Sequence, residues 1–315
     1  MSKKVTIIGA GSVGSTIAYT LSVMSVADEI VMIDVNENKV LGEALDIRQG
    51  LPFCNTVSVY AGGYAEAENS DIVVIASGLP RKAGQTRLEL AQVNVDILKS
   101  IIPKITKYAP DAIYFLVANP VDILTYTFAK YSGIPERRVF GSGTMLDSVR
   151  LRSRLAEYYG LEADYINAYA LGEHGDSMFV PWSLVSLNDI GARFYEEKRR
   201  AEDNMLPEID REEIEKYVRT SGGRVIARKG ATYYAVSMSV AHMCRCLLEN
   251  IGCVLPISVM MHGEHGVDDV CLSYPTMINC SGIFAKMPTP LTPEEEVLLR
   301  RSADALKAVI SGLAF

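Results

Sequence analysis

The chain lacks several features of secreted and membrane proteins. It has only six cysteines in 315 residues, and no two of them are spaced as CxxC. A set this sparse is typical of reduced thiols. No uninterrupted apolar stretch reaches the roughly 20 residues that a membrane-spanning helix requires. Near the N-terminus the only apolar run is VTII at residues 5–8, which is too short for a secretory signal. We therefore expect a soluble cytoplasmic protein with no membrane partner.

Basic residues are also in the minority. The chain has 31 Lys and Arg against 38 Asp and Glu, and its formal net charge is −7. Nucleic acids and anionic membranes select basic surfaces, so we expect no nucleic-acid partner. A small anionic substrate is still compatible with this charge, because one or two buried arginines can bind a carboxylate inside an acidic protein.

Repeats, low-complexity segments and long linkers are absent as well. In the first half, short runs rich in Val and Ile alternate with longer amphipathic stretches. The predicted buried strands are residues 5–8, 30–33, 57–60, 72–76 and 112–117, and the predicted helices are residues 12–26, 37–49, 88–107 and 122–131. This alternation with short connections predicts an α/β fold with a doubly wound parallel (Rossmann) sheet.

The pattern changes after about Gly141, so we predict two domains, residues 1–141 and residues 142–315. The second is predicted to be α+β. Its predicted helices are residues 145–159, 202–219 (surface), 231–250 (buried) and 294–311, and its predicted strands are residues 165–171, 254–261 and 267–272. A turn at residues 262–266 is predicted to join the last two strands.

A glycine-rich turn, GAGSVG at residues 9–14, follows the first strand and opens a helix. Gly9 permits the tight turn, Gly11 lets a pyrophosphate approach the backbone, and Gly14 allows close packing of helix and sheet. Asp34 ends the second strand, where its carboxylate would accept hydrogen bonds from a ribose and repel a 2′-phosphate. The turn therefore favours NAD over NADP, although a methyltransferase could share this first unit.

Several further motifs occur in a fixed order along the chain. They are GLPRKAGQTR (residues 78–87), VANPVD (117–122), GSGTMLDSVR (141–150), GEHGD (172–176) and KGATYY (229–234). With the glycine turn, they make the chain similar to the L-lactate and L-malate dehydrogenase family over essentially its whole length. The resemblance implies NAD as the cofactor and a small 2-oxo or 2-hydroxy acid as substrate. It also implies cofactor contacts at Val13, Lys39, Gly78, Val117, Asn119 and Ser142.

The resemblance assigns catalytic roles to His174, Asp147 and Arg87, and a role in substrate binding to Arg150. His174 is expected to be the base that takes the hydroxyl proton in alcohol oxidation and the acid in the reverse reaction, since an imidazole titrates near working pH. Asp147 is expected to orient the His174 ring and to favour its protonated form. Arg150, three residues after Asp147, has a planar guanidinium suited to a bidentate grip on the substrate carboxylate.

The loop at residues 78–87 is expected to close over bound substrate. By resemblance, its last residue, Arg87, polarises the reacting carbonyl, because a donor on a closing lid meets the developing charge with water excluded. Asn119 is expected to donate a hydrogen bond to the same oxygen. Arg81 and Thr232 are expected to contact the substrate side chain.

The two residues expected to contact the substrate side chain indicate different substrates. Arg81 is typical of malate dehydrogenases, where it pairs with the second carboxylate of oxaloacetate, whereas Thr232 is typical of lactate dehydrogenases. Because one side-chain rotation could turn Arg81 to solvent, we favour L-lactate dehydrogenase, an enzyme of glycolysis and fermentation. Malate dehydrogenase is the alternative, and a non-catalytic NAD-binding protein is a more distant one.

The resemblance further implies a homo-oligomer, a dimer or a homotetramer. Bacterial lactate dehydrogenases of this family often bind fructose 1,6-bisphosphate between subunits through an arginine and a histidine. Arg152 matches the first, but Asn167 replaces the second, so we do not expect activation.

No metal site is expected. His262 and His265 flank glycines that indicate a solvated turn, and Cys244 and Cys246 lie two apart in a predicted helix, where they would point to opposite sides.

Overall fold

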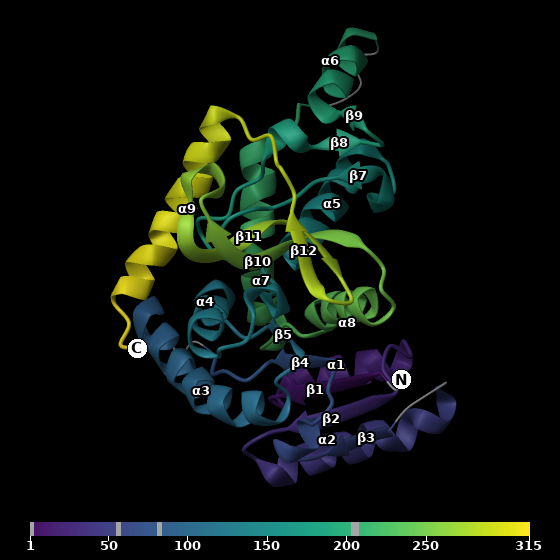
Figure 1. Cartoon of the computed structure of the whole chain (residues 1–315). Coiled ribbons are helices and arrows are strands. Elements are labelled where there is room, and N and C mark those ends of the chain that lie inside the picture. Colours follow the sequence, from purple (N-terminus) through teal and green to yellow (C-terminus); the bar gives the residue numbers. More distant parts are fainter. Residues whose placement is uncertain (1–2, 55–57, 81–83, 203–207) are drawn as a thin grey trace.

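The structure is a computed structural model that describes residues 3–54, 58–80, 84–202 and 208–315 (Figure 1). Its main feature is a sheet of nine described strands in the order β12-β11-β10-β6-β5-β4-β1-β2-β3. These strands are β1 (Lys4–Ile8), β2 (Glu29–Ile33), β3 (Ser58–Ala61), β4 (Ile72–Ile75), β5 (Ile113–Leu116), β6 (Val139–Gly141), β10 (Cys253–His262), β11 (Asp268–Asn279) and β12 (Gly282–Lys286).

The six strands β1 to β6 pair in parallel, which confirms the predicted doubly wound sheet. Strands β1, β4 and β5 are buried almost throughout, because helices cover both faces of a parallel sheet and leave no polar side for alternation. Strand β10 then joins β6 in an antiparallel sense, with Ser258 opposite Gly141, and β11 and β12 extend the sheet. One sheet thus continues across residue 141.

The described helices fall into two packed groups and one outlier. They are α1 (Ser12–Val23), α2 (Glu37–Gly50), α3 (Arg87–Tyr108), α4 (Val121–Tyr131), α5 (Met145–Tyr159), α6 (Ala192–Glu202), α7 (Arg211–Lys229), α8 (Tyr234–Leu248) and α9 (Pro293–Ser311). Helix α4 packs on α3 and α9, while α8 packs on α1 and α5, and α5 packs on α7. Figure 1 shows α6 projecting at the far end from β1–β3.

Two hydrophobic cores support this arrangement. The larger runs from Val5 to Leu313 and joins the parallel strands to β10, β11, α8 and α9. The smaller lies under α5 and α7, around Leu151, Leu155 and Val218, all of which are fully buried. No helix in the described part of the chain is long and apolar enough to cross a membrane.

Three predictions about the second half were wrong in part: the strand at residues 165–171 and the helices at residues 202–219 and 231–250. The strand predicted over residues 165–171 is reduced to β7 (Ile166–Asn167), with one isolated bridge at Leu171. Its partner β8 (Ser186–Leu187) is antiparallel, with Ser186 opposite Asn167, so residues 168–171 would have to pair with residues before Ser186, where the chain forms a 3-10 helix at residues 182–184 instead of a strand. After β8, a turn with positive φ at Asn188 and Asp189 leads to β9 (Ile190–Gly191). Strand β12 was not predicted.

The charged helix predicted over residues 202–219 is shifted. Asp210 caps α7 by accepting a hydrogen bond from the Glu213 N–H, so the helix begins at Arg211 and continues to Lys229. Helix α6 was not predicted, and residues 203–207 of the prediction lie outside the described residues. The predicted buried helix 231–250 is α8, which is buried on one side only, since the side of Tyr234 and Met238 is exposed.

Candidate active site

The glycine turn between β1 and α1 has the backbone that the sequence predicts. Gly9 has a φ of +104°, and a Cβ there would lie 2.7 Å from the Ser77 backbone nitrogen. A side chain at Gly14 would overlap the Gly9 carbonyl oxygen, so close contact between helix and turn requires glycine at this position. Gly11 is the N-cap of α1 and offers no side-chain hydrogen bond to the first helical N–H groups. These groups are therefore available to an anion.

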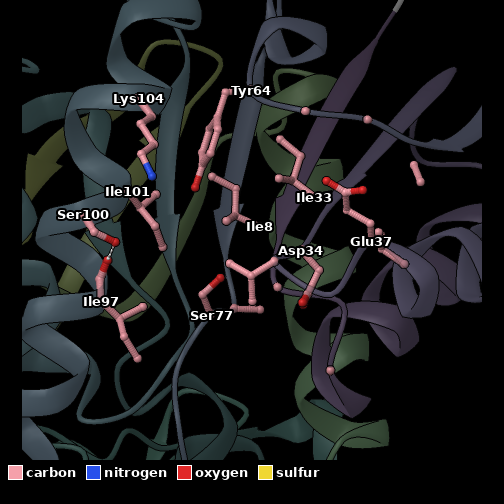
Figure 2. A pocket seen from close by; sticks show the side chains of 18 of the residues that line it. Ile8, Ile33, Asp34, Glu37, Tyr64, Ser77, Ile97, Ser100, Ile101 and Lys104 are labelled. Atoms are coloured by element: carbon pink, nitrogen blue, oxygen red, sulfur yellow. Dashed lines mark hydrogen bonds between the residues drawn. The ribbon is translucent and has the colours of Figure 1, made fainter.

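Beside this turn lies a cavity of about 750 Å³, which we call the glycine-loop cavity (Figure 2). Gly9, Gly11 and Gly78 line it, together with Asp34 at the end of β2. One oxygen of the Asp34 carboxylate accepts a hydrogen bond from the Ala10 N–H at 2.6 Å, and the other accepts one from the Asn36 N–H at 2.9 Å. These contacts fix Asp34 at the rim of the glycine turn.

Other polar residues of this cavity were not predicted. Figure 2 shows Tyr64 and Lys104 side by side, across the cavity from Asp34 and Glu37. The Lys104 ammonium lies 5.7 Å from the centre of the Tyr64 ring. Lys104 belongs to α3 and Tyr64 follows β3, so only the folded sheet brings them to this place, and the sequence carries no local signal for them.

A second cavity, of about 300 Å³, lies nearby and is called the histidine cavity here. Like the first, it borders the start of α1 and the carboxyl ends of the parallel strands, where open α/β sheets bind their ligands. The predicted residues that line it are Val13, Val117, Asn119, Ser142, Asp147, Arg150, His174 and Thr232. Lys39, by contrast, is exposed on α2 and lines neither cavity.

Asp147 joins the two cations of the histidine cavity. Its Oδ2 lies 2.6 Å from Nδ1 of His174, and its Oδ1 accepts a hydrogen bond from the Arg150 Nη1 at 2.9 Å. The Asp147 side chain is only 5% exposed, whereas that of His174 is 29% exposed. The imidazole therefore has one nitrogen on a buried carboxylate and the other free to face the cavity.

These contacts shift the ionisation of both partners. The negative charge of Asp147 raises the pKa of His174 to about 9, against the opposing effect of burial. Burial alone would raise the pKa of Asp147, but the charges of His174 and Arg150 outweigh it and hold the pKa below its usual value. The pair is thus a protonated imidazole on an ionised carboxylate at neutral pH.

A second carboxylate, that of Asp122, binds the backbone of His174 and was not predicted from the sequence. Its Oδ2 accepts a hydrogen bond from the His174 backbone N–H at 2.7 Å, and its Oδ1 accepts one from the Ser258 hydroxyl at 2.6 Å. Burial raises the pKa of Asp122 to about 6, against the effect of these two hydrogen bonds. Its place in the VANPVD motif was the available signal.

Of the two arginines predicted in the loop at residues 78–87, Arg87 does not line the histidine cavity. Arg87 begins α3, and its half-exposed side chain forms an ion pair with Asp176 and a longer contact of 3.9 Å with Glu173. Arg81 lies outside the described residues. A different arginine, Arg219 of α7, lines the histidine cavity and was not predicted; it pairs with Glu215 at 2.7 Å.

The turn between β10 and β11 differs from the predicted solvated tip. His262 is exposed, but His265 is mostly buried and contacts Glu296 at 3.0 Å and the Tyr274 hydroxyl at 3.1 Å. The two imidazoles thus have different partners. Among the described residues, no group of His, Cys, Asp and Glu side chains is arranged to hold a metal ion.

Comparisons with known proteins match this chain from end to end. The family model described as "lactate/malate dehydrogenase, NAD binding domain" matches residues 3–141, and that described as "lactate/malate dehydrogenase, alpha/beta C-terminal domain" matches residues 144–314.

Individual proteins are also similar to this chain over nearly its whole length. An L-lactate dehydrogenase of Acetivibrio thermocellus is 42% identical over 312 residues, covering 99% of this chain and 97% of the relative, and one of Clostridium botulinum (strain Loch Maree) is 41% identical over 98% of this chain and 96% of the relative. The crystal structure of a minor L-lactate dehydrogenase from Enterococcus mundtii superposes with a TM-score of 0.93 at 34% identity, covering 100% of this chain and 99% of the other.

Proposed function

The chain belongs to the lactate/malate dehydrogenase family, and we propose that it is an NAD-dependent L-lactate dehydrogenase that interconverts pyruvate and L-lactate. One observation carries the proposal: His174, Asp147 and Arg150 meet in a cavity beside the glycine turn. The residues of the glycine-loop cavity fit NAD, since uncapped N–H groups of α1 would hold the pyrophosphate and Asp34 would accept from the ribose.

The chain's own residues account for substrate binding and proton transfer. Arg150 binds the substrate carboxylate through its planar guanidinium while it remains on Asp147. Protonated His174 donates a proton to the carbonyl oxygen as pyruvate becomes lactate, and Asp147 holds the ring in the required orientation. When bound, NADH supplies the hydride to the carbonyl carbon.

Two further residues would act on the reacting oxygen. Asn119 lines the histidine cavity after β5 and would donate to that oxygen. Arg87 would reach this oxygen only after leaving Asp176. Closure of the loop would therefore replace the Arg87–Asp176 ion pair with a contact between Arg87 and the negative charge that develops on the substrate oxygen.

The choice between lactate and malate dehydrogenase is tested by comparing two substrates. Thr232 and an apolar wall of Met178, Val236 and Ile226 line the histidine cavity, and both curated relatives are L-lactate dehydrogenases. We expect kcat/KM with NADH to be at least about tenfold higher for pyruvate than for oxaloacetate. The second carboxylate of oxaloacetate would be buried against the apolar wall without a partner, which costs free energy.

The Arg81→Gln variant is the companion measurement. A preference for oxaloacetate that Arg81→Gln removes would identify the enzyme as a malate dehydrogenase instead. Turnover of neither acid by the wild-type chain would favour a non-catalytic NAD-binding protein.

The pH profile tests the role of Asp147. Because reduction needs a protonated His174 and its pKa is raised to about 9, kcat/KM for pyruvate is expected to be level below that pH and to fall above it. In Asp147→Asn the pKa should fall toward 6.5, so that at pH 8 the rate drops at least about tenfold, while lactate oxidation is affected less.

Asp304→Asn, on the exposed side of α9, is the control for this change and should keep the wild-type profile. An Asp147→Asn profile that coincides with that of the wild type would contradict the proposed pairing.

The remaining expectations form part of the same proposal. Residues 1–141 would bind the cofactor and residues 142–315 the substrate. We further infer a cytoplasmic homo-oligomer, a dimer or a homotetramer, that acts in glycolysis and fermentation.

A further inference from the structure

Two cysteines meet where α8 ends and β10 begins. Cys246 lies in the last turn of α8 and is buried in the larger core, and Cys253 is the first residue of β10 and is partly exposed. The chain reverses between them, because the Ile251 N–H donates to the Cys246 carbonyl oxygen at 2.8 Å and Asn250 has a φ of +54°. This turn brings the two side chains together, and the Cys253 thiol donates a hydrogen bond to the Cys246 sulfur.

An imidazole completes this group, which we call the thiol cluster (His242, Cys246 and Cys253). His242 lies one turn before Cys246 on α8, and its Nε2 is 3.7 Å from the Cys246 sulfur. Because His242 is exposed and Cys253 is partly exposed, the cluster reaches solvent although Cys246 itself is buried. None of its three residues lines the glycine-loop cavity or the histidine cavity, so the dehydrogenase site does not account for it.

The two thiols of the cluster ionise differently. Hydrogen bonds from Cys253 and His242 lower the pKa of Cys246 to about 5, although burial opposes them. The pKa of Cys253 is raised, because its proton is held by the Cys246 sulfur and because it is partly buried. Cys244 on the same helix lacks these partners, and burial raises its pKa to about 12. At neutral pH the cluster therefore contains one thiolate, at Cys246, beside one thiol.

This arrangement differs from that of a cysteine that only fills the core. Such a cysteine behaves as a small apolar side chain, as at Cys271, where burial raises the pKa well above its usual value. A thiolate beside a second thiol is instead the arrangement that forms a disulfide when an oxidant is present. Binding of a metal ion is the other common use of such thiols, but no described group of side chains is arranged for it.

We propose that Cys246 and Cys253 form a redox-active pair, which hydrogen peroxide or another small hydroperoxide oxidises reversibly to a disulfide. The Cys246 thiolate attacks one peroxide oxygen and becomes a sulfenic acid, while the other oxygen leaves as hydroxide and takes a proton from water. The Cys253 sulfur then bonds to the Cys246 sulfur, and the sulfenic hydroxyl leaves with the Cys253 proton as water. Two electrons pass from the thiols to the peroxide. The proposal goes beyond the proposed dehydrogenase activity and does not depend on it.

The turn that joins the two cysteines leaves room for this bond to form. A disulfide requires the sulfurs to approach to about 2.05 Å, so the hydrogen-bonded contact has to shorten. Residues 249–252 are all exposed, and no atom lies within 4 Å of a Cβ built at Gly252. The turn is therefore free to adjust without displacing the core around Cys246.

The test treats the reduced full-length protein with hydrogen peroxide at neutral pH and then alkylates the remaining thiols. Cleavage after Arg245 and Glu249 places the two cysteines on different fragments, which stay joined only if the disulfide has formed. We expect mass spectrometry to find these fragments joined, and dithiothreitol to release them. Cys246 should be oxidised at least about tenfold faster than Cys280, although Cys280 is more exposed, because a thiolate is the reactive form.

Three variants separate the roles within the thiol cluster. In Cys253→Ser, oxidation should stop at a sulfenic acid on Cys246, which dimedone traps. In Cys246→Ser, no disulfide should form and Cys253 should stay reduced. In His242→Gln, the same disulfide should form at least about threefold more slowly, because the thiolate loses a partner. His242 is exposed, so this variant tests the cluster without altering the core.

Cys280→Ser is the matched control, since it removes an exposed thiol outside the cluster. It should form the disulfide at the wild-type rate. Before oxidation, all four variants should keep the wild-type kcat for pyruvate, because none of these residues lines either cavity. A wild-type chain that reduces no 2-oxo acid but forms the disulfide would refute the proposed function and leave this inference intact.

Three results would overturn the inference. The first is a pair of fragments that stays separate after peroxide treatment, with Cys246 either reduced or oxidised to a sulfinic acid. The second is oxidation of Cys246 and Cys280 at the same rate. The third is a disulfide between two chains, seen as a dimer on a denaturing gel without reductant and absent in Cys280→Ser, which would assign the chemistry to the exposed thiol.

Discussion

Replacing His174 with glutamine is expected to lower kcat for pyruvate reduction by about 10²- to 10⁴-fold, the range that a positioned general acid contributes. Glutamine keeps a donor of similar length toward Asp147 but cannot deliver a proton to the substrate near neutral pH. The effect should appear in kcat, since Arg150 still binds the substrate carboxylate. Steady-state rates of NADH oxidation measure it.

His262→Gln is the matched control for this change. His262 is exposed, contacts Glu136 at 2.6 Å, and lines neither cavity. Its replacement should leave kcat unchanged, and both variants should bind NADH with wild-type affinity when followed by nucleotide fluorescence. A His174→Gln enzyme with more than a third of wild-type kcat would show that the proton comes from another group.

Replacing Arg150 with lysine should lower kcat/KM for pyruvate by about 10- to 100-fold, mostly through KM. Lysine keeps the positive charge but offers no planar pair of donors, and a hydrogen bond to a charged group contributes about 1.5–3 kcal/mol. The substitution affects more than substrate binding, because Arg150 also donates a hydrogen bond to Asp147 at 2.9 Å. The pH profile should therefore shift slightly in the same variant.

Arg154→Lys controls for the change of residue type on the same helix. Arg154 lies one turn further along α5, pairs with Glu157 at 2.9 Å, and lies outside the histidine cavity. It should keep wild-type KM. An Arg150→Lys enzyme with unchanged KM for pyruvate would place the carboxylate elsewhere, with Arg219 as the next candidate in the cavity.

The local signals of the first half were sufficient to predict its longer elements, but the three-residue strand β6 was not predicted. Each strand from β1 to β5 and each helix from α1 to α4 was predicted from its own pattern of apolar residues, to within a few positions. The second half was predicted less well because its short strands depend on partners. Strand β7 ends at Asn167 because its antiparallel partner β8 begins opposite it, at Ser186, and no periodicity in residues 165–171 contains that information.

The sequence by itself determined the parallel sheet, the glycine turn and the identity of the family, because these rest on short stretches whose conformation depends mainly on their own residues. The resemblance also paired Asp147 with His174, but only the tertiary structure decided the other contacts around the site. Asp122 beneath His174, Lys104 beside Tyr64, and Gly222 opposite Arg150 come from distant segments. The physical reason is that such contacts depend on how the sheet and its helices pack, and packing is a property of the whole core rather than of any local run of residues.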